Sequence, residues 1–411
     1  MVWLVYRLSN SAFLLGLVGF CSQLPILFFA PVAGVFMDRW NLHRVIVITQ
    51  FLSMLQASVL AALSVSGVIA TWQVIGLSLF IGLINAFDMP ARQSFLIQLV
   101  EGRESLTNAI GLNSSMFNAA RLVGPAVAGF LIAAVGEWFC FLLNAVSYVA
   151  VLGALLRISV PPRTANPKSQ PVLSGLWEGL RYAAGFSPIR AILVLLSVLS
   201  LAAMPLSVLM PIFANKLFLG GPGTLGVMTA SVGMGALGGA LFLASSKTVV
   251  GLGRKIAIAN AVFGLGLIAF SLSRLLWVSL IILVITGFAV MLATSASNTV
   301  LQTVVDDDKR GRVMSLYATA LLGMAPLGSL LAGSLASHFG EVLTVQLAGA
   351  ASVFSALWFA SKLPAIRRIV RPIYQRIGVL PEVTSGVAAS ACMMPDEEDN
   401  HDPDRCTNTR T

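Results

Sequence analysis

Long apolar runs separated by short polar connections make up most of the 411-residue chain. A run of about 20 apolar residues is long enough for a helix to cross a bilayer, so the pattern predicts membrane-spanning α-helices. The segment MVWLVYRL at the start is too short to cross, and we expect it to be the outer end of a first helix that is otherwise largely missing. About 11 full spans are expected, near residues 12–36, 45–67, 72–90, 108–134, 138–157, 190–215, 223–245, 255–272, 276–298, 313–337 and 343–363.

The composition excludes a soluble globular fold. Hydrophobic residues form 57% of the chain and charged residues 10%, with a mean hydropathy of +0.88, whereas soluble domains carry about 25% charged residues. Glycines are also frequent inside the apolar runs, as at Gly233, Gly235, Gly238 and Gly239. In a membrane, such small residues favour close packing of helices. The sequence therefore predicts an all-α membrane protein.

The distribution of charge predicts an orientation. The chain carries 26 Lys and Arg against 17 Asp and Glu, a net charge of +9, which in a soluble protein would favour nucleic acid as a partner. Here the basic residues lie almost entirely in alternate connections between the spans, and basic connections of this kind stay in the cytoplasm. We therefore expect a multi-pass membrane protein whose basic connections face the cytoplasm, with membrane lipids rather than nucleic acid as partners.

The spacing of the spans divides the chain into four segments. We expect an N-terminal bundle over residues 1–157, a cytoplasmic linker over 158–189, a C-terminal bundle over 190–363 and a cytoplasmic, disordered tail over 364–411. A weak repeat relates the bundles, because FLIQLVEGRESLTNAIGLN and TVLQTVVDDDKRGRVMSLY both leave a span through a Gln and a charged turn. Parallel repeats of six spans are one known design of transporters.

Patterns that would indicate catalysis are scarce. The four cysteines form no CxxC pair, and His43, His338 and His401 lie far apart in the sequence. A metal site or a hydrolytic triad needs such residues close together. The sequence also lacks a phosphate-binding loop of the Walker type. We expect no metal, no cofactor and no enzymatic activity.

The connection GVFMDRWNLHR groups a small residue, an acid and several bases. Gly34 would let a neighbouring backbone approach, and Asp38 could accept hydrogen bonds from the N–H groups at an adjacent helix end. Arg39 and Arg44 could bind a carboxylate or a lipid phosphate. The simpler alternative is an ordinary basic loop that faces the cytoplasm.

This connection resembles the loop between helices two and three of the major facilitator superfamily, whose glycine, Asp-Arg pair and final base match Gly34, Asp38, Arg39 and Arg44. Further segments are similar to the subgroup that contains the enterobactin exporter and bacterial transmembrane secretion effectors. The resemblance implies the major facilitator fold, with two six-helix bundles, and secondary transport by alternating access across a bacterial inner membrane. The segments that carry it are FDMPARQSF, NSSMFNAARLVGPAVAG and RGRVMSLYATALLGMAPLG.

In that superfamily the loop latches the two bundles in the outward-facing state, and its partner is an acid at the end of helix four. The resemblance assigns this partner role to Asp88, and it implies that Gly124, Pro125 and Gly129 form a helix break. The corresponding connection in the later half, SSKTVVGLGRK, has no acid. A second latch would therefore be degenerate.

Arg121 lies near the middle of a predicted span, where a charge is costly, so we expect it to face protein or water. Ser114 and Asn118 share its helix face by their spacing. One interpretation makes this face a polar wall of the substrate pathway, with Arg121 attracting anionic or phenolic groups. The alternative is a structural arginine that bonds backbone carbonyls near Pro125.

Ser295, Asn298 and Gln302 recur at three- and four-residue spacing in the later half, and they could line the opposite wall of the pathway. Hydroxyl groups in membrane helices more often bond their own backbone or a neighbouring helix. The predicted spans place no acid deep in the membrane, because Asp88 falls at the expected end of its helix. Proton coupling is therefore implied by the resemblance alone.

The function expected from the sequence is secondary active export of a small amphiphilic molecule, such as a siderophore or a drug-like compound. A lipid or metabolite transporter of the same fold is one alternative. A non-transporting membrane sensor or scaffold is another, because the first helix is expected to be largely missing. A substrate-dependent flux separates the transporters from the sensor.

Overall fold

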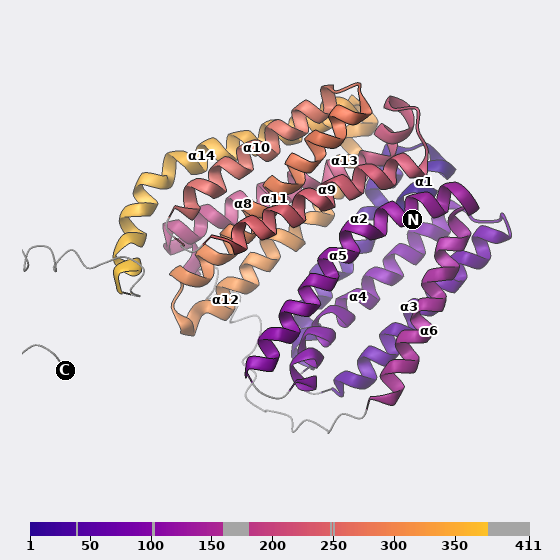
Figure 1. The fold of residues 1–411 in the computed structure, drawn as a ribbon, viewed down its shortest axis with the longest axis horizontal. Helices are drawn as coiled ribbons and strands as arrows, with labels where there is room; N and C mark the ends of the chain where they lie inside the picture. The colour runs from indigo at the N-terminus through magenta and orange to yellow at the C-terminus, as the bar shows by residue number, and fades with distance from the viewer. Residues whose placement is uncertain (38–39, 101–102, 159–180, 247–248, 250, 377–411) are drawn as a thin grey trace, which may run out of the picture.

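The computed structural model describes residues 1–37, 40–100, 103–158, 181–246, 249 and 251–376, and the regular structure within these ranges is helical (Figure 1). Two short segments are π-helical, η1 (Phe213–Leu217) and η2 (Thr319–Gly323). The α-helices are α1 (Val2–Ser9), α2 (Ala12–Met37), α3 (Leu42–Val65), α4 (Thr71–Leu99), α5 (Arg103–Val135), α6 (Glu137–Arg157), α8 (Ser187–Ile212), α9 (Pro222–Ala244), α10 (Leu252–Leu272), α11 (Leu276–Val304), α12 (Asp307–Ala318), α13 (Met324–Phe339) and α14 (Glu341–Arg376).

The helices have the length and composition of membrane spans. Within the described ranges, ten are long and apolar enough to cross a bilayer, and α5 adds a shorter apolar segment, Leu122–Val135. Helix α1 has only 8 residues, of which Leu4, Val5 and Tyr6 are buried. The prediction of an all-α membrane protein is confirmed.

The end of α14 differs from the sequence-based expectation. The tail was expected to begin at residue 364, but α14 continues to Arg376. Ile366, Val370 and Tyr374 are buried, one turn apart along the same helix face. A count of consecutive apolar residues misses such an extension, because the bases between these positions interrupt the run while the buried stripe continues.

The helices form two bundles, one from α1 to α6 and the other from α8 to α14 (Figure 1). The bundles meet where α2 packs on α13 and α5 packs on α9. They converge at the end that carries α1, which we call the closed end, and diverge toward the end that carries α12, which we call the open end. The interface between the bundles is therefore concentrated at one end of the molecule.

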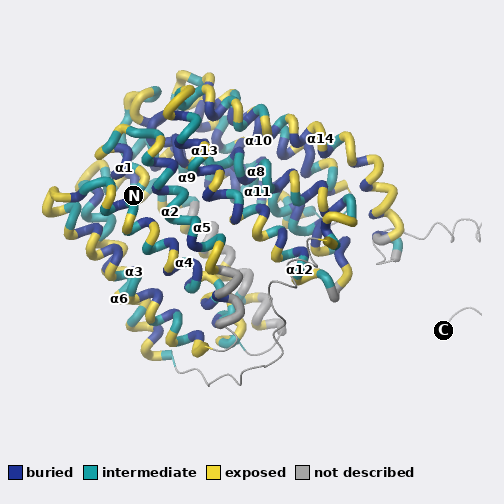
Figure 2. Tube along the Cα trace, turned by 180° about the vertical axis from the view of Figure 1, so that it is seen from behind, coloured by how far each residue is buried: buried dark blue, intermediate teal, exposed yellow. Residues whose placement is uncertain are grey.

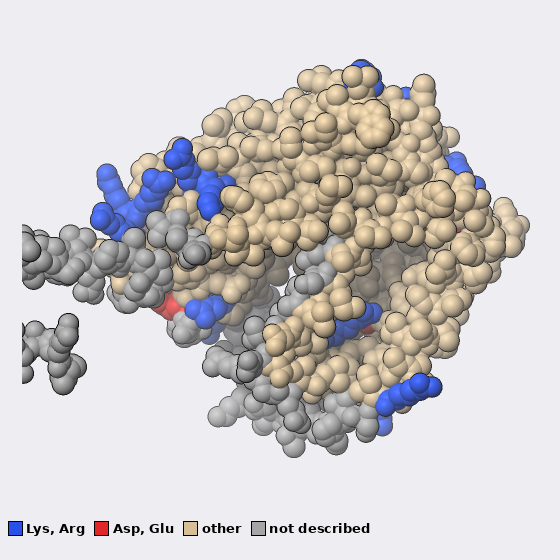
Figure 3. Space-filling view, viewed as in Figure 1, with Lys and Arg blue, Asp and Glu red and all other residues tan. Residues whose placement is uncertain are grey.

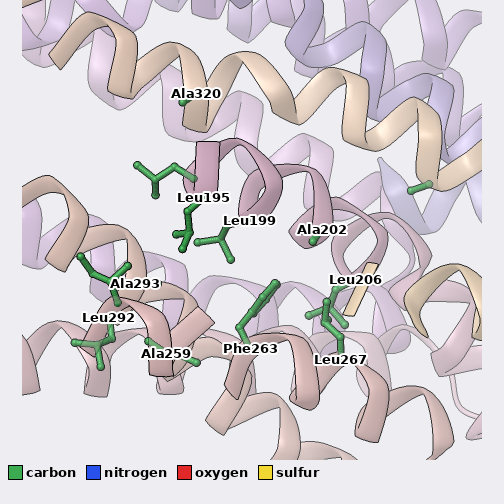
Figure 4. Packing of buried hydrophobic residues seen from close by; sticks show 14 of the residues in the cluster. Leu195, Leu199, Ala202, Leu206, Ala259, Phe263, Leu267, Leu292, Ala293 and Ala320 are labelled. Carbon is green, nitrogen blue, oxygen red and sulfur yellow. The ribbon is translucent and has the colours of Figure 1, made fainter. Parts of the chain in front are cut away.

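Helix α8 forms the centre of the C-terminal bundle. Leu195, Leu199 and Leu209 are fully buried, and α8 packs against both α13 and α14. Figure 4 shows Leu199 of α8 near Phe263 and Leu267 of α10, and all three belong to the buried hydrophobic core. Buried residues follow these facing surfaces, whereas the outward faces of the helices are exposed apolar surface, as expected for contact with lipid (Figure 2).

The glycines of α9 allow the close helix contact that the sequence predicted. A Cβ atom at Gly239 would lie 2.6 Å from the carbonyl oxygen of Phe288 on α11, and one at Gly235 would overlap the carbonyl group of Val284. No side chain fits at either position. The backbones of α9 and α11 therefore touch directly, which confirms the packing role of this glycine segment.

Candidate transport pathway

A hollow lies between the two bundles and widens toward the open end (Figure 3). Basic atoms with acidic atoms beside them are visible inside it. A path through the molecule must pass along this hollow and then between the helices that meet at the closed end. Two crossings of those helices therefore decide whether the path is open.

The first crossing joins α2 and α13. A Cβ atom at Gly16 would lie 2.5 Å from the carbonyl oxygen of Ser329 and 2.7 Å from the Cα atom of Gly333. A Cβ atom at Gly333 would in turn lie 2.8 Å from the Cα atom of Gly16. Since ordinary contacts of a Cβ atom begin at 3.4 Å, only glycine fits on either side of this crossing.

The second crossing joins α5 and α9 in the same way. A Cβ atom at Gly129 would lie 2.8 Å from the Cα atom of Gly226, and one at Gly226 would lie 2.7 Å from the carbonyl oxygen of Pro125. Beside the crossings, Asn215 Nδ2 donates a hydrogen bond to the Tyr6 hydroxyl at 3.2 Å and links the bundles again. The closed end is thus sealed by backbone contact at two places.

Helix α5 runs without interruption through the expected helix break. Pro125 lies inside the helix, and Gly129 is part of the crossing with α9. A Cβ atom at Gly124 would meet nothing within 4 Å. The structure thus gives Gly129 and the Pro125 carbonyl a packing position between the bundles.

Asp88 lies further from the end of its helix than the sequence indicated. The predicted span ended at residue 90, but α4 continues through Pro90 to Leu99. At 1.5 Å per residue, Asp88 therefore lies about 16 Å before the end of its helix. The predicted span ended too early because Arg92 and Gln93 interrupt the apolar run, whereas the helix continues through Pro90 and beyond.

A polar cluster surrounds Asp88. Its Oδ1 accepts hydrogen bonds from the Thr49 hydroxyl at 2.6 Å and from Gln50 Nε2 at 2.8 Å, both on α3. Its Oδ2 forms an ion pair with Arg92 Nε at 2.6 Å, one turn further along α4. The Asp88 side chain is only 8% exposed, whereas that of Arg92 is 54% exposed. Both oxygens of the buried carboxylate are thus occupied by donors.

Most of the expected latch lies outside the described part of the chain. Asp38 and Arg39 are outside the described residues, and Gly34 lies in the last turns of α2. Arg44 is exposed at the start of α3, where its backbone N–H donates to Asn41 Oδ1 at 3.2 Å. In the described residues Asp88 pairs with Arg92 rather than with a base of this loop.

The polar face expected on α5 falls within that helix, but the side chains of Ser114, Asn118 and Arg121 lie outside the described part of the structure. Arg121 is one turn from Pro125, on the open-end side of the crossing with α9. Its backbone is therefore positioned at the boundary between the bundles.

The residues expected on the opposite wall lie on α11. Gln302 is exposed, and its Nε2 donates to Asn298 Oδ1 at 2.7 Å. The Ser295 carbonyl accepts a hydrogen bond from the Thr299 hydroxyl at 3.0 Å. Tyr317 of α12 joins this region, because its hydroxyl donates to the Thr294 carbonyl at 3.3 Å. The structure thus brings Asn298 and Gln302 together as an amide pair.

Sequence reasoning missed the most organised polar group of the N-terminal bundle. It placed Arg92 in a connection and gave no role to Thr49 or Gln50. The four-residue spacing of Asp88 and Arg92 was a usable signal, because residues at that spacing face each other on a helix. The contact of Asp88 with Thr49 and Gln50 of α3 had no such signal in the sequence, since it depends on how α3 and α4 pack against each other.

Comparison with known proteins supports the fold and the class of protein. The family model described as transmembrane secretion effector matches residues 1–373. The staphyloferrin A transporter of Staphylococcus aureus is 27% identical over 360 residues, covering 87% of this chain and 89% of that protein. The multidrug efflux pump Tap of Mycolicibacterium fortuitum is 29% identical over 357 residues, covering 82% and 84%.

Solved structures with the same fold are also transporters. The nucleoside transporter NupG matches with a TM-score of 0.69 at 12% identity, covering 88% of this chain and 93% of NupG. A bacterial homolog of the human lysosomal transporter Spinster, in an inward-facing and occupied conformation, matches with a TM-score of 0.64 at 14% identity, covering 91% and 92%. These relatives are membrane transporters and not enzymes, and the chain belongs to the transmembrane secretion effector family of the major facilitator superfamily.

Proposed function

We propose that this protein exports a small amphiphilic molecule from the cytoplasm by alternating access. The observation that carries the proposal is the match to the transmembrane secretion effector family over residues 1–373. The staphyloferrin A transporter and the Tap efflux pump match over most of this chain. A siderophore or a drug-like compound is therefore the substrate class that these relatives favour.

The open end is the cytoplasmic end in this proposal. Arg157, Arg254 and Arg371 lie at or beyond helix ends on that side, and all three are exposed. The connections at the closed end carry few bases, among them Lys216 and Arg274. Since basic connections stay in the cytoplasm, the arrangement with a closed outer end is the inward-facing state, ready to take up substrate from inside the cell.

The latch acts when the bundles close at the cytoplasmic end. Asp38 would then accept hydrogen bonds from the end of a neighbouring helix and hold the outward-facing state. Gly34 would permit the close approach, and Arg39 and Arg44 would pair with carboxylates or lipid phosphates. Its partner Asp88 is bound to Arg92 in the inward-facing arrangement, so latching requires this ion pair to rearrange.

Export is coupled to proton entry in this proposal. Among the acidic side chains that the structure describes, Asp88 lies within a membrane span, whereas Glu137, Asp306 and Glu341 lie at helix starts. An acid at membrane depth is the usual proton carrier in transporters. Asp88 is therefore the described residue best placed for this role.

The proposal is tested by drug accumulation in living cells. The full chain is expressed in a bacterial strain that lacks its own drug pumps, and retained radiolabelled erythromycin and ethidium are measured against an empty vector. The comparison is repeated with Asp38→Asn at equal protein level. We expect lower accumulation with the parent chain and a loss of that effect in the variant. Equal accumulation of both compounds in all strains would instead favour a sensor or scaffold.

A further inference from the structure

We propose that Arg92 is a binding site for the carboxylate of the exported substrate. This inference rests on the proposed export function and deepens it, because it assigns a chemical class to the substrate. The site consists of the exposed edge of one guanidinium group, which a buried carboxylate holds in place on the N-terminal wall of the hollow.

The guanidinium of Arg92 is turned back toward the middle of α4. A long basic side chain near a membrane surface normally extends toward the headgroups. Arg92 does the opposite, because its Nε pairs with Asp88 one turn back along α4, away from the nearer end of that helix. The guanidinium is therefore held inside the membrane-spanning part of α4. A charge that is 54% exposed at this depth cannot face lipid cheaply, so it faces the water in the hollow.

The guanidinium is held in place by a carboxylate that a second helix fixes. Thr49 and Gln50 of α3 both donate to Asp88 Oδ1. The carboxylate that pairs with Arg92 is therefore also fixed by a second helix. The ion pair joins Asp88 Oδ2 to the Nε of Arg92 at 2.6 Å. Within the described part of the chain, no residue bonds its two terminal nitrogens. With respect to the described residues, the outer edge of the guanidinium is therefore open, and its parallel N–H donors have the geometry that carboxylates bind bidentately.

The accessible part of the Asp88–Arg92 pair is selective for the charge of a ligand. Asp88 is 8% exposed and both of its oxygens already accept from donors. A cationic ligand in the hollow therefore finds no free acceptor at this place. A ligand on the outer edge of Arg92 also lies nearer to the guanidinium than to the carboxylate behind it, so the attraction exceeds the repulsion. The accessible part of the pair favours anions over cations.

The experiment uses three probes with the same aromatic ring and different charge. Binding of 2-naphthoate, 2-naphthamide and 2-naphthylmethyl-trimethylammonium to the purified full chain is measured at equilibrium in nanodiscs of phosphatidylcholine. For Arg92→Gln we expect at least a tenfold weaker affinity for 2-naphthoate, with the affinities for the other two probes changed less than twofold. For Arg92→Lys we expect an intermediate loss, because lysine lacks the bidentate edge. Arg157→Gln, at the end of α6, serves as the matched control and should bind all three probes like the parent.

Removing Arg92 alone leaves a buried charge without its partner, which can prevent folding. The double variant Asp88→Asn with Arg92→Gln removes both charges, and it should fold and show the same selective loss of 2-naphthoate binding. Unchanged 2-naphthoate affinity in either folded variant would overturn the proposal, as would an equal loss for all three probes. Phosphatidylglycerol that displaces 2-naphthoate from the parent but not from the variants would instead assign Arg92 to a lipid headgroup. Because binding is measured without transport, the result of the accumulation test with erythromycin and ethidium does not depend on the result of the binding test.

Discussion

The two glycine crossings make a prediction about the balance between conformations. If Gly16 is replaced by alanine, its Cβ atom would lie 2.5 Å from the Ser329 carbonyl oxygen, where ordinary contacts begin at 3.4 Å. α2 and α13 would therefore have to move apart by about an ångström, which is the difference between these two distances. The clash is relieved when α2 and α13 separate at the closed end. We expect Gly16→Ala to favour the outward-facing state.

The size of the effect follows from the cost of overpacking. Inserting a methyl group into a packed contact costs about 1–3 kcal/mol. Because only the inward-facing state contains this contact, the whole cost falls on one side of the equilibrium, and the ratio of the two states shifts by about 5- to 150-fold. Gly226→Ala, at the second crossing, should act in the same direction, and the double variant should show a larger shift.

The shift is measured with spin labels across the closed end. Cysteines at Val68 and Leu219, which are 64% and 89% exposed and lie in different bundles, report the separation by electron double resonance. The native cysteines are replaced beforehand. Gly76→Ala is the control, because a Cβ atom there meets nothing within 4 Å, while the change of helix propensity is the same. If Gly16→Ala and Gly76→Ala give the same distance distribution as the parent, the crossings do not control the closed end.

Two further predictions concern stability and orientation. Asn260→Leu removes an amide that donates to the Ser352 carbonyl at 3.1 Å and to the Ser355 hydroxyl at 2.7 Å; it should lower the free energy of unfolding by about 1–3 kcal/mol, and an unchanged thermal denaturation curve in detergent would contradict this role. A cysteine at Val68 should react with an impermeant maleimide in intact cells, whereas one at Arg157 should react only after permeabilisation; the reverse pattern would invert the assigned orientation.

The all-α membrane architecture was accessible from the sequence because each span buries its own backbone hydrogen bonds and must be apolar over a known length. The close helix contact at the glycine segment of α9 was also predictable, since small residues in a membrane helix mainly allow neighbouring helices to approach closely. Boundaries were less accessible. Pro90 and the bases after Leu363 interrupt the apolar pattern, yet α4 and α14 continue through them.

The candidate site was predictable only in part. Asn298 and Gln302 were found from their spacing, and the structure pairs them. Asp88 was singled out, but its depth, its bonds to α3 and the exposed edge of Arg92 depend on packing between helices. The same holds for Gly16 and Gly129, whose partners lie in the other bundle. A single sequence without tertiary contacts contains no local signal for such pairings.

We propose that the protein exports its substrate from the cytoplasmic side through the hollow at the open end. Uptake of radiolabelled erythromycin into inside-out membrane vesicles tests it most directly, because uptake in these vesicles corresponds to export from the cell. With an imposed gradient that makes the vesicle lumen acidic, vesicles with the full chain should accumulate the drug, and a protonophore or Asp38→Asn should abolish the difference from vesicles without the protein. Uptake confined to right-side-out vesicles would contradict the assigned direction.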